Sequence, residues 1–268
     1  MPSDGVKKMK LDIRGNVALV TGSSRGLGRA IAITLADQGC DLLLTGRDEA
    51  ALCETAEAVK QKGRKAVVVT IDLTDERAAN QLTQTAKREF GGLDILVNNA
   101  GTTQRGDFFS LTDEDWQDGF ALKFFAHVKL TRAAWPLLAE RKGSLITIAG
   151  MSGRLPDMDF TIGSSVNAAC IAFTKALSNL GKKDGVQVNT INPSLVETER
   201  LWRNLRKQME ATGKSEAQVR NERAQAAGFT RFGTPRDVAS LVAFIASHDG
   251  SWLHGATIDL DGGRSPSL

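Results

Sequence analysis

The stretch VALVTGSSRGLGRAIAITLADQG occupies residues 17–39. An apolar strand pattern runs into three glycines, Gly22, Gly26 and Gly28, and a helical pattern follows immediately. Glycines at such a turn let backbone N–H groups approach a pyrophosphate, and the helix N-terminus adds partial positive charge. The alternative is a tight turn without a ligand, but the strand–turn–helix context favours a dinucleotide site. The same turn adds Ser24, Arg25 and Leu27 as expected contacts.

Short, near-continuous apolar runs alternate with helical patterns along the rest of the chain. Such runs are typical of strands that are covered on both faces of a parallel sheet. The alternation predicts right-handed βαβ units and one α/β domain over residues 1–268, with a Rossmann-like doubly wound sheet of about seven mostly parallel strands. We expect strands at 17–21, 41–45, 66–71, 94–98, 144–149, 186–191 and 256–260, and helices at 28–38, 49–62, 75–90, 113–139, 163–181 and 235–247.

Local signals refine this pattern. Asp75 is expected to start a helix, and Thr234 should cap the helix that has Pro235 in its first position. Residues 1–12 are expected to form a flexible tail. The charged segment from about 197 to 230 interrupts the alternation, so it is interpreted as a helical excursion over the carboxyl edge of the sheet that can serve as a substrate lid.

Composition narrows the class of protein. The net charge is only +3, with 34 Lys and Arg interspersed among 31 Asp and Glu, so no nucleic-acid partner is expected. Three scattered cysteines without CxxC spacing favour a reducing compartment. The polar start is unlike a secretory signal, and no apolar run is long enough for a membrane span, so a cytoplasmic location with no membrane partner follows by elimination.

The second predicted strand indicates which nicotinamide cofactor is bound. An acidic residue commonly follows that strand and binds the ribose 2′-hydroxyl of NAD. Here Arg47 follows Gly46, and its guanidinium can pair with a 2′-phosphate, which Arg25 can also reach. The pattern favours NADP(H) over NAD(H), although Asp48 is a mild counter-argument and either arginine can instead be solvated.

The chain as a whole resembles the short-chain dehydrogenase/reductase family from about residue 13 to 264. The resemblance implies that Asp72 and Leu73 meet the adenine and that Asn99, Ala100 and Gly101 line the cofactor near its ribose. Pro193 would lie beside the nicotinamide, and a homotetramer or homodimer would form through the helices near 113–139 and 163–181. The motifs are TGSSRGLG (21–28), DLT (72–74), NNAG (98–101), INPSLVET (191–198), RFGTPRDVASLVAFIAS (231–247) and GATIDLDGG (255–263).

The same resemblance implies an unusual reaction centre. The family transfers hydride between NAD(P)H and a carbonyl or alcohol with the help of an Asn, a Ser, a Tyr and a Lys. This chain contains no Tyr. The ungapped motifs place Lys123, Gly150, Gly163 and Asn167 at those four positions, so ordinary turnover is expected to be weak.

Several side chains are candidates to replace the missing groups. Lys123 is expected to be solvated or paired with an aspartate; the alternative is a desolvated ammonium that acts as an acid, a base or a Schiff-base nucleophile. Asp157 and Asp159 are expected to be solvated, although a buried one would be a candidate general acid. His127, His254 and the hydroxyls of Ser152, Thr161, Ser164 and Ser165 lack an obvious base, and no cluster has metal-ligand spacing, so no metal is predicted.

Three functions therefore stay open. The first is an oxidoreductase with a proton path that does not use a tyrosine. The second is a catalytically inactive protein that binds the cofactor for structure, sensing or assembly. The third is a non-redox lyase or hydratase that uses the same cleft, because a fold alone does not fix a function.

Overall fold

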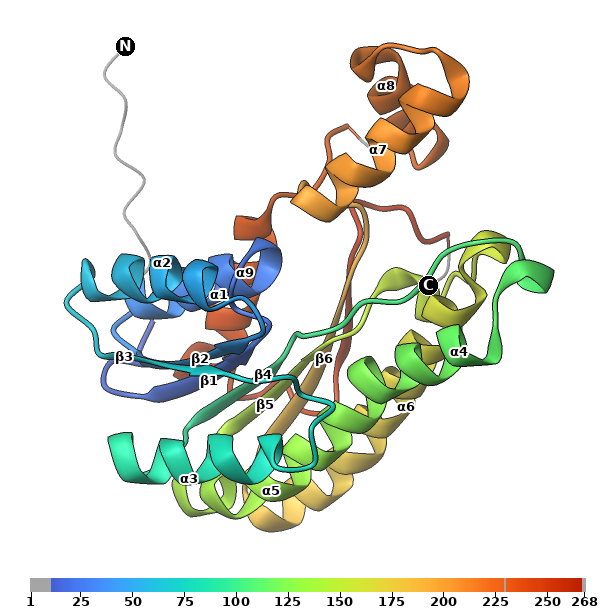
Figure 1. Ribbon diagram of the computed structural model, residues 1–268. Helices are drawn as coiled ribbons and strands as arrows, with labels where there is room; N and C mark the ends of the chain where they lie inside the picture. Colours follow the sequence, from blue (N-terminus) through green and yellow to red (C-terminus); the bar gives the residue numbers. More distant parts are fainter. Residues whose placement is uncertain (1–10, 229, 267–268) are drawn as a thin grey trace, which may run out of the picture.

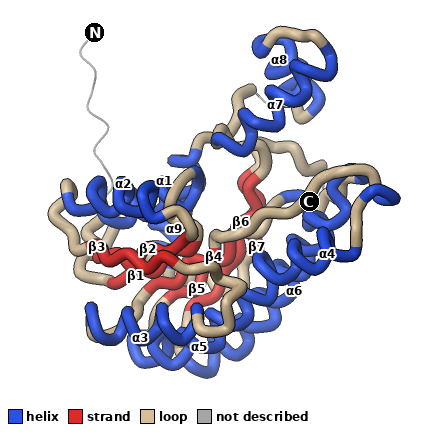
Figure 2. The backbone as a smooth tube through the Cα atoms, viewed as in Figure 1, coloured by secondary structure: helices blue, strands red, loops and turns tan. Residues whose placement is uncertain are grey.

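A parallel sheet of seven strands organises the molecule (Figures 1 and 2). The computed structural model describes residues 11–228 and 230–266. The strand order is β3-β2-β1-β4-β5-β6-β7, and all neighbouring pairs are parallel. The predicted doubly wound class is confirmed. The strands are β1 (Val17–Thr21), β2 (Asp41–Gly46), β3 (Ala66–Thr70), β4 (Ile95–Asn98), β5 (Ser144–Ile148), β6 (Gln187–Pro193) and β7 (Thr257–Leu260).

Helices cover both faces of the sheet (Figure 1). Helices α1 (Gly26–Asp37), α2 (Glu49–Lys60) and α9 (Pro235–Ile245) lie on one face. Helices α3 (Ala78–Phe90), α5 (Ala126–Arg141) and α6 (Thr161–Asp184) lie on the other. The hydroxyl of Thr234 caps α9 and Pro235 occupies its first turn, as predicted.

The two helical layers explain why the central strands have near-continuous apolar runs. Successive residues of a strand point to opposite faces of its sheet. In β2, Leu42 and Leu44 pack into the core under α1, α2 and α9, whereas Leu43 packs into the core on the α3 and α5 side. All three leucines are completely buried. Strand β2 is therefore buried on both faces, as are β1, β4 and β5, whereas the edge strands β3 and β7 are only partly buried.

Two predicted helices differ from the observed ones. Helix α3 begins at Ala78 and not at Asp75, because the Asp75 carboxylate binds the N–H and the guanidinium of Arg77 in the preceding turn. The helix expected over 113–139 is divided into α4 (Asp113–Phe120), a π-helical turn (Ala121–Phe125) and α5. Such π-helical turns are frequent at functional sites, and this one carries Lys123.

The charged excursion forms a helical hairpin. Helices α7 (Glu199–Thr212) and α8 (Glu216–Ala226) project beyond the carboxyl edge of the sheet (Figure 1). They have a small core of their own that contains Leu201, Leu205 and Val219. We refer to these two helices as the α7–α8 hairpin.

Two further predictions concern the N-terminal tail and membrane spans. The tail expected over 1–12 lies outside the described residues except for its last two. Among the helices of the described segments, none is long and apolar enough to cross a membrane.

Candidate functional site

The turn between β1 and α1 requires glycine at three positions. Gly22 and Gly26 have φ angles of +65° and +56°, in the left-handed region that favours glycine. A Cβ atom at Gly28 would lie 2.1 Å from the Gly22 carbonyl oxygen. The first turn of α1 has neither a side-chain cap nor an acidic residue. Its backbone N–H groups therefore suit an external anion, as a dinucleotide pyrophosphate requires.

Hydrogen bonds join the end of β1 to the end of β4 beside this cradle. The buried Thr21 hydroxyl accepts bonds from the backbone N–H groups of Asn99 and Ala100, both at 2.9 Å. The Asn99 amide donates to the Thr21 carbonyl at 2.8 Å. These bonds fix the loop after β4 against the glycine turn, so both segments border one crevice.

The other predicted cofactor residues converge on the same edge. Arg47 follows β2, and its guanidinium lies 3.6 Å from the Asp72 carboxylate after β3. A backbone hydrogen bond from Thr74 lowers the pKa of Asp72, and Arg47 lowers it further. Arg25 lies 3.8 Å from Glu199 at the start of α7. The segments that contain the predicted residues are the glycine turn 22–28, Arg47, 72–73, 99–101 and Pro193.

The four positions that the resemblance assigns to catalysis also lie near this edge. Gly150 follows β5, Gly163 and Asn167 lie in the first turns of α6, and Lys123 lies in the π-helical turn. A Cβ atom at Gly150 would be 2.9 Å from the Asn167 amide nitrogen. That amide donates to the Ser152 hydroxyl at 2.8 Å, while the buried Asn167 Oδ1 has no hydrogen-bond partner. An unpaired buried acceptor fits a ligand that donates a hydrogen bond, as a ribose hydroxyl does.

Lys123 is neither fully solvated nor paired with an aspartate, so that expectation was wrong. Its ammonium donates to the Ala149 carbonyl at 2.9 Å, and its stem runs so close to Gly101 that a Cβ there would be 2.7 Å from it. Desolvation lowers the pKa of Lys123 to about 8, and the nearby charge of Arg200 adds to the effect. Part of the side chain is still accessible to solvent. Lys123 thus combines a desolvated ammonium with a side chain that is only partly buried.

An aromatic ring occupies the space beside Gly163. A Cβ atom at this position would lie 2.1 Å from the Phe160 ring. The Arg105 guanidinium covers that ring at 4.5 Å from its centroid and forms a 2.9 Å ion pair with Asp157. Neither Phe160 nor Arg105 is predictable from the sequence, because an isolated Phe and an isolated Arg in loops carry no local signal.

The other candidate catalytic side chains form hydrogen bonds or ion pairs within the protein. Partial burial raises the pKa of Asp157, but hydrogen bonds from Arg105 and from the Asp159 N–H lower it more. The pKa of Asp157 is therefore below its usual range, and the carboxylate is ionised at neutral pH. The Ser164 hydroxyl accepts from the Asp157 N–H at 3.3 Å. His127 is buried and its Nε2 lies 2.8 Å from the Ala100 oxygen. His254 contacts the Ser178 carbonyl at 2.6 Å. Asp157 and His127, whose pKa values are both lowered, therefore hold no proton to give at neutral pH.

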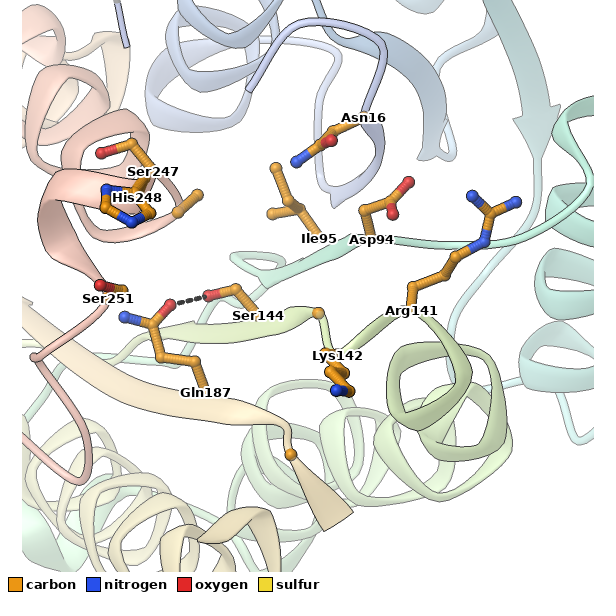
Figure 3. Close-up of a pocket in the computed structure, with 13 residues that line it drawn as sticks. Asn16, Asp94, Ile95, Arg141, Lys142, Ser144, Gln187, Ser247, His248 and Ser251 are labelled. Atoms are coloured by element: carbon orange, nitrogen blue, oxygen red, sulfur yellow. Dashed lines mark hydrogen bonds between the residues drawn. The ribbon is translucent and has the colours of Figure 1, made fainter. Parts of the chain in front are cut away.

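A cavity of about 370 Å³ lies at the opposite, amino edge of the sheet (Figure 3). Residues at the starts of β1, β4, β5 and β6 line it, among them Asn16, Asp94, Ser144 and Gln187. In open parallel sheets, ligands bind at the carboxyl ends of the strands. We therefore place the candidate site at the crevice beside Gly22 and Lys123 and not in this cavity.

Comparison with known proteins identifies the family. The family model described as short chain dehydrogenase matches residues 16–210. The chain is a member of the short-chain dehydrogenase family. Within this family it is 36% identical over 255 residues to an uncharacterized oxidoreductase of Mycobacterium tuberculosis, with 94% of this chain and 93% of the relative covered.

Two further short-chain dehydrogenase relatives have informative names. The chain is 31% identical to a 3-oxoacyl-acyl-carrier-protein reductase of Vibrio cholerae, with 94% of this chain and 98% of the relative covered. It also resembles the crystal structure of L-sorbose reductase from Gluconobacter frateurii in complex with NADPH and L-sorbose. That comparison has a TM-score of 0.93 at 31% identity and covers 97% of this chain and all of the other.

The contact between Phe160 and Gly163 predicts a specific stability defect. Gly163→Ala should lower the free energy of unfolding by about 1–3 kcal/mol, because the added methyl group overlaps the ring. Urea unfolding of Gly163→Ala, Phe160→Ala and the double variant measures the coupling between the two positions. The double variant should lose less stability than the sum of the single losses. Ser165→Ala, at an exposed position in the same turn, is the control and should change stability by less than about 0.5 kcal/mol. Additive losses would show that the ring does not fill this space.

Burial of His127 predicts a pH-dependent stability. Desolvation lowers the pKa of His127 from 6.5 to about 4, and the charge of Lys123 adds to this effect. The hydrogen bond to Ala100 raises the pKa but does not outweigh the desolvation. Between these values the unfolded chain binds more protons, so stability should fall by up to about 3 kcal/mol as pH drops from 6.5 to 4.

His127→Gln is the matched control, because glutamine can keep the bond to Ala100 but does not titrate. Urea unfolding across this pH range should show a shallower pH dependence for His127→Gln than for the wild type. Parallel profiles of the two proteins would contradict the assignment.

Proposed function

We propose that this chain is an NADP(H)-dependent carbonyl reductase in which the Lys123 ammonium supplies the proton. The observation that carries the proposal is the desolvated ammonium of Lys123, which donates to the Ala149 carbonyl while its stem lies against Gly101. The relatives named as reductases of a 3-oxoacyl group and of L-sorbose both act on carbonyl compounds, which supports the reaction class.

The residues of the carboxyl edge suit the dinucleotide. The uncapped start of α1 and the glycine turn would hold the pyrophosphate, and the loop at 99–101 would line the ribose on the nicotinamide side. Arg47 and Arg25 would hold the 2′-phosphate; each now lies near one acid, and both are largely exposed and can turn toward a phosphate. When bound, the reduced nicotinamide supplies the hydride that passes to the carbonyl carbon of the substrate.

Lys123 would complete the reduction. Its ammonium gives one proton to the carbonyl oxygen, the product is the alcohol, and the neutral amine then regains a proton from water. A pKa of about 8 suits this task, because the group is protonated at neutral pH but releases its proton more readily than an ordinary lysine. The Ala149 carbonyl holds the nitrogen in place. Without a hydroxyl at positions 150 and 163, the carbonyl oxygen has fewer donors, so the proposed turnover is slow.

A second candidate function is cofactor binding without catalysis. The observation that favours it is the contact between the Phe160 ring and Gly163. This apolar ring occupies the space where the family resemblance implies the phenol of a tyrosine. In this case the protein would bind NADPH but would not oxidise it with any carbonyl compound.

Replacement of Lys123 tests the proposed reaction. With Lys123→Met, kcat/KM for NADPH oxidation on the best substrate of a ketone and aldehyde panel should fall by about 10²–10⁴, because the proton donor is lost. In the wild type, kcat/KM should decline above about pH 8 as the ammonium deprotonates. Lys129→Met is the control, since Lys129 is exposed on α5, and should retain full activity. Full activity of Lys123→Met would refute the role of this residue, and NADPH binding with no turnover in the wild type would establish the second candidate.

Removal of Arg47 tests the cofactor preference. Arg47→Ala should weaken NADPH binding by about 10-fold or more, since a charged hydrogen-bonded contact contributes about 1.5–3 kcal/mol. NADH binding should change little, because it has no 2′-phosphate. Fluorescence titration of both cofactors measures the two dissociation constants. Equal losses for NADH and NADPH, or a wild-type preference for NADH, would contradict the assignment.

A further inference from the structure

The start of the α7–α8 hairpin brings an acid to the glycine turn. Helix α7 begins close to the start of α1 (Figure 1), and the Glu199 carboxylate in its first turn lies 3.8 Å from the Arg25 guanidinium. Within residues 11–228 and 230–266, this ion pair is the one polar contact of either side chain. An acid of the hairpin and a cation of the proposed cofactor site are therefore paired with each other.

The acid is held in place by the residues that precede it. The Thr198 hydroxyl caps α7, and the Thr198 methyl group lies 3.8 Å from the position of a Cβ at Gly26. Arg220 of α8 binds the Glu197 carboxylate at 2.6 Å. The backbone that carries Glu199 is thus packed against the glycine turn on one side and bound to α8 on the other.

The cation, in contrast, is free to change its partner. The Arg25 side chain is 63% exposed, and 3.8 Å is too long for a hydrogen bond, so the carboxylate does not fix the guanidinium. An exposed ion pair of this kind contributes little to stability. A phosphate monoester carries about two negative charges at neutral pH and offers several acceptor oxygens to a guanidinium. A phosphate within reach is therefore a stronger partner for Arg25 than Glu199.

We propose that Glu199 is a specificity-determining residue that competes with the 2′-phosphate of NADP(H) for Arg25. The inference rests on the proposed function, in which Arg25 holds this phosphate. NADPH draws Arg25 away from Glu199, whereas NADH has a hydroxyl at the same place and leaves the ion pair intact. Glu199 thereby lowers the preference for NADPH over NADH. After Arg25 leaves, the N-terminal dipole of α7 still stabilises the carboxylate.

The ion pair between Arg47 and Asp72 is a less selective probe of the same competition. The N–H and the hydroxyl of Thr74 bind Asp72 Oδ1 at 2.9 and 2.7 Å, so this acid has partners besides Arg47. The family resemblance also implies that Asp72 meets the adenine, which both cofactors carry. A change at Glu199 leaves those contacts untouched.

Fluorescence titration with NADPH and NADH tests the proposal without requiring turnover. The quantity to measure is the NADH dissociation constant divided by the NADPH dissociation constant. Both cofactors carry the pyrophosphate, so any direct repulsion between Glu199 and that group cancels in this ratio. Glu199→Gln should raise the ratio by about 2–5-fold, or about 0.4–1 kcal/mol, as expected for an exposed ion pair. Glu199→Lys should raise it further, because it repels Arg25.

A double-variant cycle assigns the effect to Arg25. Arg25→Gln alone should lower the ratio, since one contact to the 2′-phosphate is lost. In the Arg25→Gln background, Glu199→Gln should leave the ratio unchanged, because the acid then has no cation to withhold. Glu210→Gln is the matched control. It removes an exposed acid of α7 that forms no ion pair within the described residues, and it should keep the wild-type ratio.

Two results would overturn the inference alone: an unchanged or lower ratio in Glu199→Gln, or an equal rise with and without Arg25. A wild-type ratio in Arg25→Gln, or no NADPH binding by the wild type, would refute the 2′-phosphate assignment together with the inference. Failure of the proposed reaction gives a different result. In that case the ratios change as expected, but NADPH is not oxidised with any carbonyl compound.

Discussion

The buried hydroxyl of Thr21 holds together the two halves of the candidate site. It accepts the backbone N–H groups that follow β4 and donates to the Val97 carbonyl at 3.3 Å, so the ends of β1 and β4 cannot separate. The crevice of a doubly wound sheet opens between these strands, where the direction of strand order reverses. The glycine turn forms one wall of this crevice, and the loop at 99–101 forms the other. Helix α1 directs the N–H groups of its uncapped first turn into the crevice.

Around this backbone framework, the candidate site has a cation at Lys123 and lacks the hydroxyls that the family resemblance implies at positions 150 and 163. Lys123 reaches the crevice from a π-helical turn, and glycine occupies positions 150 and 163. Arg105 adds a guanidinium that covers the Phe160 ring beside Gly163. In this account the Lys123 ammonium, with its lowered pKa, gives the proton.

The sequence predicted the fold well because the deciding signals are local. Apolar runs locate all seven strands to within about two residues. The four residues 234–237, TPRD, predict the N-cap at Thr234. The later start of α3 and the interruption of the helix at Ala121 were not predicted. The Asp75 carboxylate binds the Arg77 N–H before α3, and a π-helical turn begins at Ala121, but neither feature changes the apolar pattern of the sequence.

The site was only partly predictable. Glycine motifs located the cofactor edge, because a backbone cradle requires glycine wherever it occurs. The environment of Lys123 and the contacts of Arg105 with Asp157 and Phe160 depend on segments far apart in the sequence. No spacing rule encodes such contacts, so only the folded chain reveals them.

The ionisation of Lys123 in the folded protein tests the account most directly. An NMR titration of protein labelled with ¹³C at the lysine Cε, with Lys123→Met used to assign the signal, measures this ionisation apart from any reaction. The account predicts an apparent pKa of about 8. An apparent pKa at the ordinary lysine value of 10.5 would show a solvated ammonium and would contradict the proposed proton donor.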